Sequence, residues 1–330
     1  MERRTTVGVA GAAVAAIGGG LALRRSLRGL SEADGDRPLD TDTTFPPGEV
    51  ATVATGDGGV IATESTGDGP TVVLVHGITS SRQDWGPLAR DLVGTGHTVI
   101  GVDQRGHGDS DPGAEGYSST RLGADLADVL TTLDLRNVVL VGHSMGGIAA
   151  LTFAVEEPAI FAERVRSLVL VATTPRTSRL LVGPPRWLVD LALGRESLSS
   201  IDWVVHRPVL ARTLFGRFGS RRLVDAALVA AQRARPVEVA RNAAGLAGYD
   251  VTDRLSSITT PTRCFYGTHD LITPPKGNRR IARSIPDATA TEIGGAGHLL
   301  IWTHVPELAA EIIAAVAAGV DGAGASPAES

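Results

Sequence analysis

The chain has 330 residues, of which 43% are hydrophobic and 20% are charged, a composition typical of a folded globular protein and not of a disordered one. A formal net charge of -5 gives no overall basic character for nucleic-acid binding, and a single cysteine, Cys264, excludes an internal disulfide. No Cys/His spacing of a zinc site and no internal repeat is present.

The N-terminal part of the chain differs in composition from the rest. Residues 7–23 carry no charge and are flanked by arginines on both sides. As a helix this segment would measure about 26 Å, slightly less than the ~30 Å hydrocarbon core of a bilayer. We interpret residues 1–25 as an N-terminal membrane anchor in preference to a cleaved signal segment, and residues 26–47 as a polar linker. This predicts a membrane-associated protein; secretion after signal cleavage and a cytoplasmic protein with a soluble tail are the alternatives.

From residue 48 the chain alternates between strand and helix patterns. Strands are predicted at 49–55, 60–66, 71–77, 97–103, 137–144, 166–173, 262–270 and 288–298, the last two ending in polar loops, and helices at 83–94, 119–134, 145–156 and 305–318. A glycine turn between the first two strands predicts a β-hairpin. The later alternation favours an α/β fold with a mostly parallel sheet between helices, whose reactive groups gather at the carboxyl ends of the strands.

The segment VLVGHSMGGIAAL places a serine between a predicted strand and a predicted helix. Residues 142–146 read G-x-S-x-G, a pattern typical of a sharp strand-to-helix turn. Such a turn holds Ser144 in a strained backbone conformation, and the two glycines leave room for the neighbouring strand and helix. The Ser144 hydroxyl is therefore a candidate nucleophile. The N–H of Met145, at the start of the helix, is free to stabilise an anionic intermediate.

A serine hydroxyl is a weak nucleophile and needs a general base, for which the chain offers eight histidines. His298 lies in the polar loop that ends the last predicted strand and so is expected at the same sheet edge as Ser144. The other seven lie in turns, at the starts of elements, in an arginine-rich insert or, for His269, directly before Asp270. The base in turn needs an orienting carboxylate. Asp270 ends the preceding strand, and residues 172–180 contain no carboxylate that would compete for this role.

Five segments, HGIT, DQRGHGDS, GHSMGG, GTHDLITP and GAGH, together resemble the α/β-hydrolase superfamily over residues 48–318. The resemblance implies the α/β-hydrolase fold, with a helical cap inserted after the sixth strand. It implies that Ser144 is the nucleophile, Asp270 the acid and His298 the base, in the chain order of that superfamily. The DQRGHGDS segment is usually a structural turn in such proteins and is left out of the chemistry.

The resemblance also implies that the backbone N–H of Ile78 joins that of Met145 in an oxyanion hole. No metal and no organic cofactor is needed. We expect a carboxylic-ester hydrolase of esterase or monoacylglycerol-lipase type, acting through an acyl-enzyme on a small-molecule or lipid ester, with no nucleic-acid partner and with membrane contact through residues 7–23.

The domain organisation follows from the same resemblance. Residues 48–174 and 249–318 are expected to form the core, residues 175–248 the cap, and residues 319–330 a flexible tail. The cap segment holds 12 arginines against 5 carboxylates, with aromatic residues among them. Such a cap is expected to supply the substrate pocket and exclude water, and its basic residues suit either an anionic membrane surface or an ordinary solvated helix face.

Several other functions are compatible with these residues. Carbon–carbon bond hydrolases, cofactor-free haloperoxidases and acyltransferases share the same triad. Members of the fold with an aspartate nucleophile are disfavoured by Ser144. A non-catalytic, membrane-tethered binding protein is the alternative from another class, since a fold does not prove activity. A dinucleotide-binding protein is disfavoured because the first βα turn lacks G-x-G-x-x-G.

Overall fold

The computed structural model describes residues 42–177 and 207–318. The predicted anchor, most of the predicted linker, residues 178–206 of the predicted cap and the predicted C-terminal tail lie outside the described residues.

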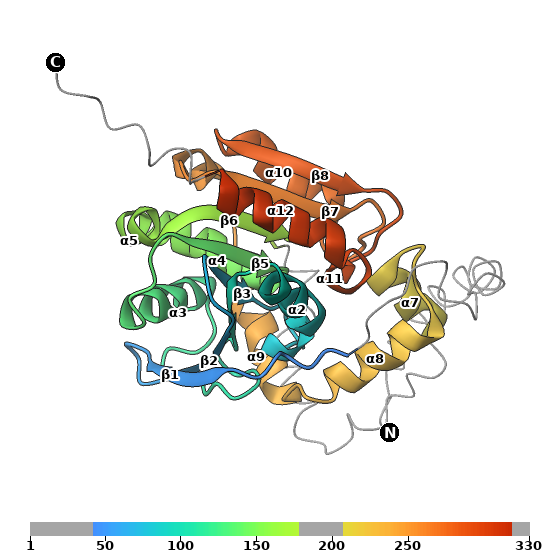
Figure 1. Cartoon of the computed structure of the whole chain (residues 1–330), viewed down its shortest axis with the longest axis horizontal. Helices are drawn as coiled ribbons and strands as arrows, with labels where there is room; N and C mark the ends of the chain where they lie inside the picture. Colours follow the sequence, from blue (N-terminus) through green and yellow to red (C-terminus); the bar gives the residue numbers. More distant parts are fainter. Residues whose placement is uncertain (1–41, 178–206, 319–330) are drawn as a thin grey trace, which may run out of the picture.

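Eight strands form one sheet at the centre of the molecule (Figure 1). They are β1 (Glu49–Ala54), β2 (Val60–Thr66), β3 (Thr71–Val75), β4 (Thr98–Val102), β5 (Val138–His143), β6 (Val165–Val171), β7 (Thr262–Gly267) and β8 (Ala288–Ile293). Their order in the sheet is β1-β2-β4-β3-β5-β6-β7-β8. Only the β1–β2 and β2–β4 pairs are antiparallel, so the predicted hairpin and the predicted mostly parallel sheet are confirmed.

Helices cover both faces of this sheet. They are η2 (Arg82–Trp85), α2 (Gly86–Gly94), α3 (Ser119–Thr132), α4 (Met145–Glu156), α5 (Pro158–Arg164), α7 (Arg207–Phe215), α8 (Arg221–Ala231), α9 (Pro236–Gly245), η5 (Thr252–Ser257), α10 (Pro275–Ser284), α11 (Leu300–Thr303) and α12 (Val305–Ala317). In Figure 1, α2 and α12 lie in front of the sheet. Buried residues of α3, α4 and α10 belong to a separate apolar cluster on the opposite face.

Strand β3 shows why the central strands read as unbroken apolar runs. Val73 and Val75 belong to the cluster shared with α3, α4 and α10, whereas Val72 and Leu74 belong to the cluster shared with α2 and α12. Successive side chains of a strand point to opposite faces, so a strand covered on both sides needs an apolar residue at every position. All four side chains are fully buried.

The sequence reading missed α5, α10 and α11. Helix α10, with the sequence PKGNRRIARS, buries only Asn278 and Ile281. A helix that places so few side chains in the core leaves no apolar stripe to recognise, because the stripe arises from burial along one face. Helix α11 is only four residues long, which is too short for a periodic signal.

Helices α7 and α9, which lie in the segment predicted to form a cap, contact loops at the carboxyl edge of the sheet. The end of α7 joins the loop after β8, since Leu299 N donates to Leu214 O at 2.7 Å and Arg217 N donates to Gly295 O at 2.8 Å. Helix α9 contacts the loop after β4, where the Tyr117 hydroxyl donates to the Glu238 carboxylate. In Figure 1, α7 and α8 lie beyond one end of the sheet, at the right.

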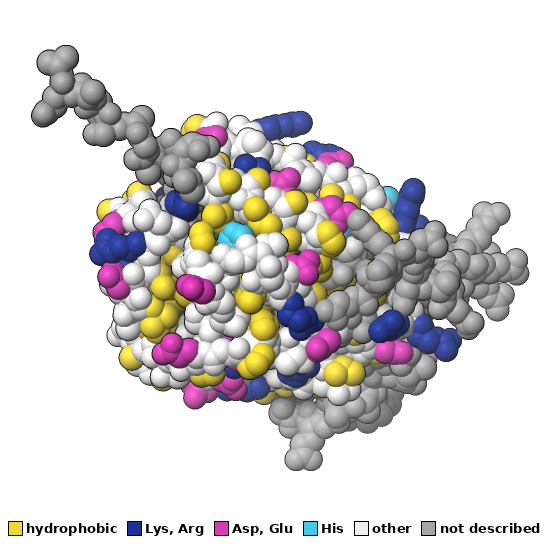
Figure 2. Space-filling view, viewed as in Figure 1, with side chains coloured by type: hydrophobic (Ala, Val, Ile, Leu, Met, Phe, Trp, Pro, Cys, Tyr) yellow, Lys and Arg dark blue, Asp and Glu magenta, His cyan; other side chains and the backbone are white. Residues whose placement is uncertain are grey.

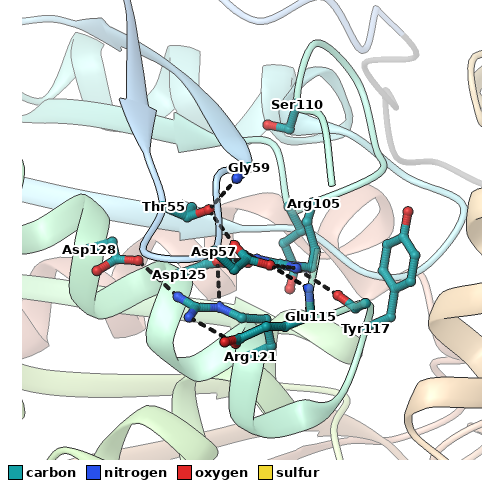
Figure 3. Close-up of polar contacts among 12 residues, drawn as sticks. Thr55, Asp57, Gly59, Arg105, Ser110, Glu115, Tyr117, Arg121, Asp125 and Asp128 are labelled. Atoms are coloured by element: carbon teal, nitrogen blue, oxygen red, sulfur yellow. Dashed lines mark hydrogen bonds and ion pairs between the residues drawn. The ribbon is translucent and has the colours of Figure 1, made fainter. Parts of the chain in front are cut away.

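A buried ion cluster holds that loop after β4. The Arg105 guanidinium, fully buried, donates to both oxygens of Asp57 in the β1–β2 turn and to both oxygens of Asp125 in α3 (Figure 3). It also donates to the main-chain oxygen of Gly116 at 2.6 Å. The DQRGHGDS segment thus has the structural role that the sequence resemblance implied.

The described surface is mixed in charge. Figure 2 shows Lys/Arg and Asp/Glu side chains interspersed among apolar ones on the face it draws. In the described ranges no single helix has the length and hydropathy of a membrane span; α4 and α5 together reach those values, with a bend of 111° between them.

Candidate active site

Ser144 lies at the turn between β5 and α4, with φ 53° and ψ -113°. Few residues other than glycine adopt a positive φ, so this backbone is strained and must be held by its surroundings. The Ser144 N–H donates to Val171 O at 2.9 Å, and the Thr173 hydroxyl donates to Ser144 O at 2.7 Å. Both bonds come from the end of β6 and hold the turn in place.

The two glycines of this turn are required by close backbone contacts. A Cβ on Gly142 would lie 2.6 Å from the carbonyl oxygen of Gly146, and a Cβ on Gly146 would lie 2.2 Å from the carbonyl oxygen of Val75. Both positions are closer than non-bonded atoms allow, and backbone atoms cannot move aside as a side-chain tip can. The first turn of α4 therefore packs directly against the end of β3, which agrees with the steric reason inferred from the sequence.

His298 and Asp270 are hydrogen-bonded to each other at the same edge of the sheet. The distance from His298 Nδ1 to Asp270 Oδ2 is 2.9 Å, and both side chains are buried. An ionised carboxylate only accepts hydrogen bonds, so Nδ1 carries the hydrogen and Nε2 is left with its lone pair. A neutral imidazole in this tautomer can accept a proton at Nε2.

The Asp270 carboxylate is ionised despite its burial. Burial by itself raises its pKa, but the neighbouring His298 and hydrogen bonds from Thr273 outweigh that effect, and the net pKa lies below the ordinary value for aspartate. Oδ1 accepts the backbone N–H groups of Ile272 and Thr273 at 2.8 and 2.9 Å. A buried anion bonded in this way can stabilise a positive charge on His298.

His143 connects the serine turn to the histidine loop. Its Nε2 donates to the main-chain oxygen of His298 at 3.1 Å, and the two rings have centroids 4.8 Å apart. Burial and, to a smaller extent, the neighbouring His298 lower the pKa of His143 to about 3. His143 is therefore neutral at physiological pH, and it lies next to Ser144 in sequence and next to His298 in space.

The loop after β3 lies against the serine turn. A Cβ placed on Gly77 would be 3.1 Å from Ser144 Cβ. His76 holds this loop, because its Nδ1–H donates to Gly77 O at 2.6 Å while its Nε2 accepts the N–H of Gln104 at 3.0 Å. Ile78 follows Gly77 directly and is partly buried against the core.

Met145, the other predicted oxyanion residue, is the first residue of α4 and is buried. The N–H at this position of a helix has no intrahelical acceptor and carries a partial positive charge. Both predicted N–H groups therefore belong to segments in contact with Ser144, one from the end of β3 and one from the start of α4.

Sequence reasoning missed three residues of this arrangement, namely His143, Thr173 and Thr273. His143 is adjacent to Ser144 and Thr273 lies three positions after Asp270, whereas Thr173 is 29 positions from Ser144. Their side chains bond to main-chain atoms or to Asp270. These partners come from strand ends that meet only in the folded protein, so no spacing of residues in the sequence predicts them. Within residues 42–177 and 207–318, no group of three or more His, Cys, Asp or Glu side chains could hold a metal ion.

Comparison with known proteins gives the family. A family model described as alpha/beta hydrolase fold matches residues 70–305, well over half of the chain. Non-heme chloroperoxidase CPO-A1 of Kitasatospora aureofaciens is 30% identical over 242 residues, covering 69% of this chain and 84% of that protein. The sn-1-specific diacylglycerol lipase ABHD11 of Xenopus laevis is 37% identical over 123 residues, covering 37% of this chain but only 38% of the lipase.

Among solved structures, a thermophilic esterase from Thermogutta terrifontis, with malate bound, is similar at a TM-score of 0.68 and 28% identity. The match covers 80% of this chain and 96% of the esterase. The sheet order, the strained serine turn and the matched family model lead to one conclusion: the chain belongs to the α/β-hydrolase family.

Proposed function

We propose that the protein is a serine hydrolase that cleaves carboxylic esters through an acyl-enzyme. The observation that carries this proposal is the hydrogen-bonded pair of His298 and Asp270, 2.9 Å apart, beside the strained turn that presents Ser144. The His143 bond to the His298 main chain connects the pair to the turn. The solved esterase that is 28% identical to this chain supports the same reaction class.

In the proposed reaction, Ser144 Oγ attacks the ester carbonyl carbon while His298 Nε2 takes the hydroxyl proton. The N–H groups of Ile78 and Met145 donate to the oxygen that becomes negative, each being worth about 3–4 kcal/mol of transition-state stabilisation. The alcohol leaves with the proton from His298. Water, deprotonated by the same nitrogen, then attacks the acyl-enzyme and releases the carboxylic acid.

The Asp270 carboxylate has a supporting part in these steps. It stays ionised and stabilises the imidazolium that forms when His298 takes the proton. It also keeps the His298 ring in the tautomer that leaves Nε2 free to act. Because His143 is neutral, the new charge on His298 meets no like charge on the adjacent ring.

For the substrate we propose lipid-like esters such as monoacylglycerols. The support is the partial similarity to a protein named as a diacylglycerol lipase, together with the uncharged segment 7–23, which suits an enzyme held at a membrane. An anchored enzyme meets esters that are themselves dissolved in the bilayer.

The test of the reaction is hydrolysis of p-nitrophenyl esters from acetate to palmitate by wild-type protein and Ser144→Ala. We expect turnover by the wild type and a loss of more than a hundredfold in the variant, with unchanged thermal unfolding. A variant that keeps a tenth of the wild-type rate would contradict the role of Ser144. A rate optimum at long acyl chains would support the lipid proposal, and an optimum at acetate would contradict it.

The similarity to a non-heme chloroperoxidase favours a cofactor-free haloperoxidase as the second candidate. In that reaction the acyl-enzyme would be attacked by hydrogen peroxide in place of water, so that a peracid forms. Measuring halide oxidation with acetate and hydrogen peroxide, beside ester hydrolysis, distinguishes the two. Halide oxidation that exceeds ester hydrolysis, and that is lost in Ser144→Ala, would favour the second candidate.

We propose membrane association through residues 7–23. Removing residues 1–30 is expected to release the protein from membranes without lowering its turnover of soluble esters, because the described core begins well after this segment. Sedimentation with membranes, before and after the truncation, is the measurement. A truncated protein that still sediments with membranes would contradict the anchor.

A further inference from the structure

Thr273 lies in the loop after β7 and contacts several parts of the proposed site. It is buried, with 6% of its surface exposed, and it follows Asp270 by three residues. Its hydroxyl oxygen lies 2.7 Å from Asp270 Oδ2, 2.7 Å from the main-chain oxygen of Ala172, and 3.3 Å from His298 Nδ1. Its own N–H donates to the other oxygen of Asp270.

The hydroxyl has a single hydrogen and two acceptors at equal distance. With Asp270 ionised, the hydrogen points to Oδ2, because a hydroxyl lone pair directed at a carboxylate would be repelled. Asp270 then accepts four hydrogen bonds, two at Oδ1 from backbone N–H groups and two at Oδ2 from Thr273 and His298. Four donors satisfy the bonding capacity of a buried carboxylate.

We infer that Thr273 is a positioning residue for the proposed reaction: its hydroxyl donates to Oδ2 of Asp270 and so holds that oxygen in line with His298 Nδ1. This inference rests on the proposed function. The hydroxyl competes with His298 for the same oxygen. Removing it leaves Oδ2 with a stronger affinity for the remaining hydrogen, the one carried by His298 Nδ1, so His298 holds its second proton more tightly.

Within the part of the chain that the structure describes, the side chains that contact His298 come from two segments. Asp270 and Thr273 approach it from the loop after β7, and His143 from the end of β5. Burial lowers the pKa of His143 to about 3, so it stays neutral throughout the range in which an imidazole of ordinary pKa titrates. A change in that range upon substitution of Thr273 therefore reports on His298 and Asp270.

The experiment compares Thr273→Val, which keeps the shape and removes the hydroxyl, with Thr273→Ser, which keeps the hydroxyl. Thr262→Val is the matched control, since Thr262 is a buried threonine of β7 whose hydroxyl bonds to Thr260 O. For Thr273→Val we expect kcat on a p-nitrophenyl ester to fall about tenfold at an unchanged KM, with the acid limb of the pH profile moved to higher pH. Thr273→Ser is expected to recover most of the rate and the wild-type limb, and Thr262→Val to leave both unchanged.

An NMR titration of His298 in the same variants needs no substrate. A higher pKa of His298 in Thr273→Val than in wild type supports the inference even where no ester is hydrolysed, so failure of the proposed function is told apart from failure of this inference. A Thr273→Val protein with the wild-type His298 titration and pH profile would overturn it. Equal impairment of Thr273→Ser and Thr273→Val would also overturn it, because retaining the hydroxyl would then give no advantage.

Discussion

His143 Nε2 donates a hydrogen bond to the main-chain oxygen of His298 at 3.1 Å, so the residue before Ser144 holds the loop that carries the proposed base. A carbonyl oxygen only accepts, so the hydrogen of the neutral His143 ring must be on Nε2. The donor comes from the end of β5 and the acceptor from the loop after β8, at the far edge of the sheet. The bond thus keeps two distant segments at one relative position.

His143→Phe should keep the ring packing but remove this donor. We expect kcat/KM for ester hydrolysis to fall at least tenfold, because misplacing a catalytic group by even 1 Å can cost about a hundredfold. His143→Gln, which offers a side-chain N–H, should retain more of the rate. Steady-state kinetics of both variants, with thermal unfolding as the control for folding, is the measurement. Equal rates for His143→Phe and wild type would show that the bond has no part in positioning His298.

Asp84 gives a pH dependence of stability. Burial raises the pKa of its carboxyl to about 6, although the Ser80 hydroxyl donates to it at 2.5 Å. The unfolded chain loses this proton near pH 3.8, and the folded protein keeps it to about pH 6. The folded state therefore binds more protons in between, so this group lowers the free energy of unfolding by about 2 kcal/mol as pH rises from 4 to 6.

The side chain of Asp84→Asn cannot titrate, so this variant should not lose the stability that wild type loses as pH rises from 4 to 6. Urea unfolding at intervals from pH 4 to pH 8 is expected to show the variant gaining stability relative to wild type as pH rises. Asp91→Asn, a change of an exposed carboxylate on α2, is the matched control and should follow the wild-type curve. Parallel curves for Asp84→Asn and wild type would mean that Asp84 does not retain its proton in the folded protein.

The glycine contact at the serine turn predicts a sharp difference between two similar substitutions. In Gly146→Ala the new methyl group would meet Val75 O at 2.2 Å, whereas in Gly94→Ala, at the end of α2, it would meet no atom within 4 Å. Gly146→Ala should lose about 2–3 kcal/mol of stability and most activity, because the turn must shift. Gly94→Ala should be neutral or slightly stabilising. A Gly146→Ala protein with wild-type melting temperature and rate would disprove the close approach.

We expect that removing one buried acid from the ion cluster of Figure 3 strongly destabilises the folded protein. Asp125→Asn leaves the buried Arg105 guanidinium with half of its charge compensation, and we expect a loss of about 3–5 kcal/mol in the free energy of unfolding. Glu292→Gln, which breaks a solvent-exposed pair with Arg279, should cost no more than about 1 kcal/mol. Chemical denaturation of the two variants tests this; similar losses would show that burial does not strengthen the Arg105 pairs.

Local chemistry made part of the site readable from the sequence. The G-x-S-x-G segment needs its glycines within two residues of Ser144, so its pattern survives in the linear chain. The apolar runs of the parallel strands are readable for a similar reason, since burial on both faces requires an apolar residue at every position. The edge on which Asp270 and His298 meet followed from the rule that parallel strands end together.

By itself, therefore, the sequence determined the alternation of strands and helices, the family resemblance and the residue types of a serine, acid and base at one sheet edge. Only the tertiary structure decided which atoms they bond to. Many of these partners lie far along the chain or on other strands, as for the hydroxyl of Thr273, the ring of His143 and the backbone of Val75. Arg105 likewise pairs with acids from a hairpin turn and from a helix. Such partners depend on the distance between packed segments, which is set by the whole core and has no counterpart in the spacing of residues along the chain.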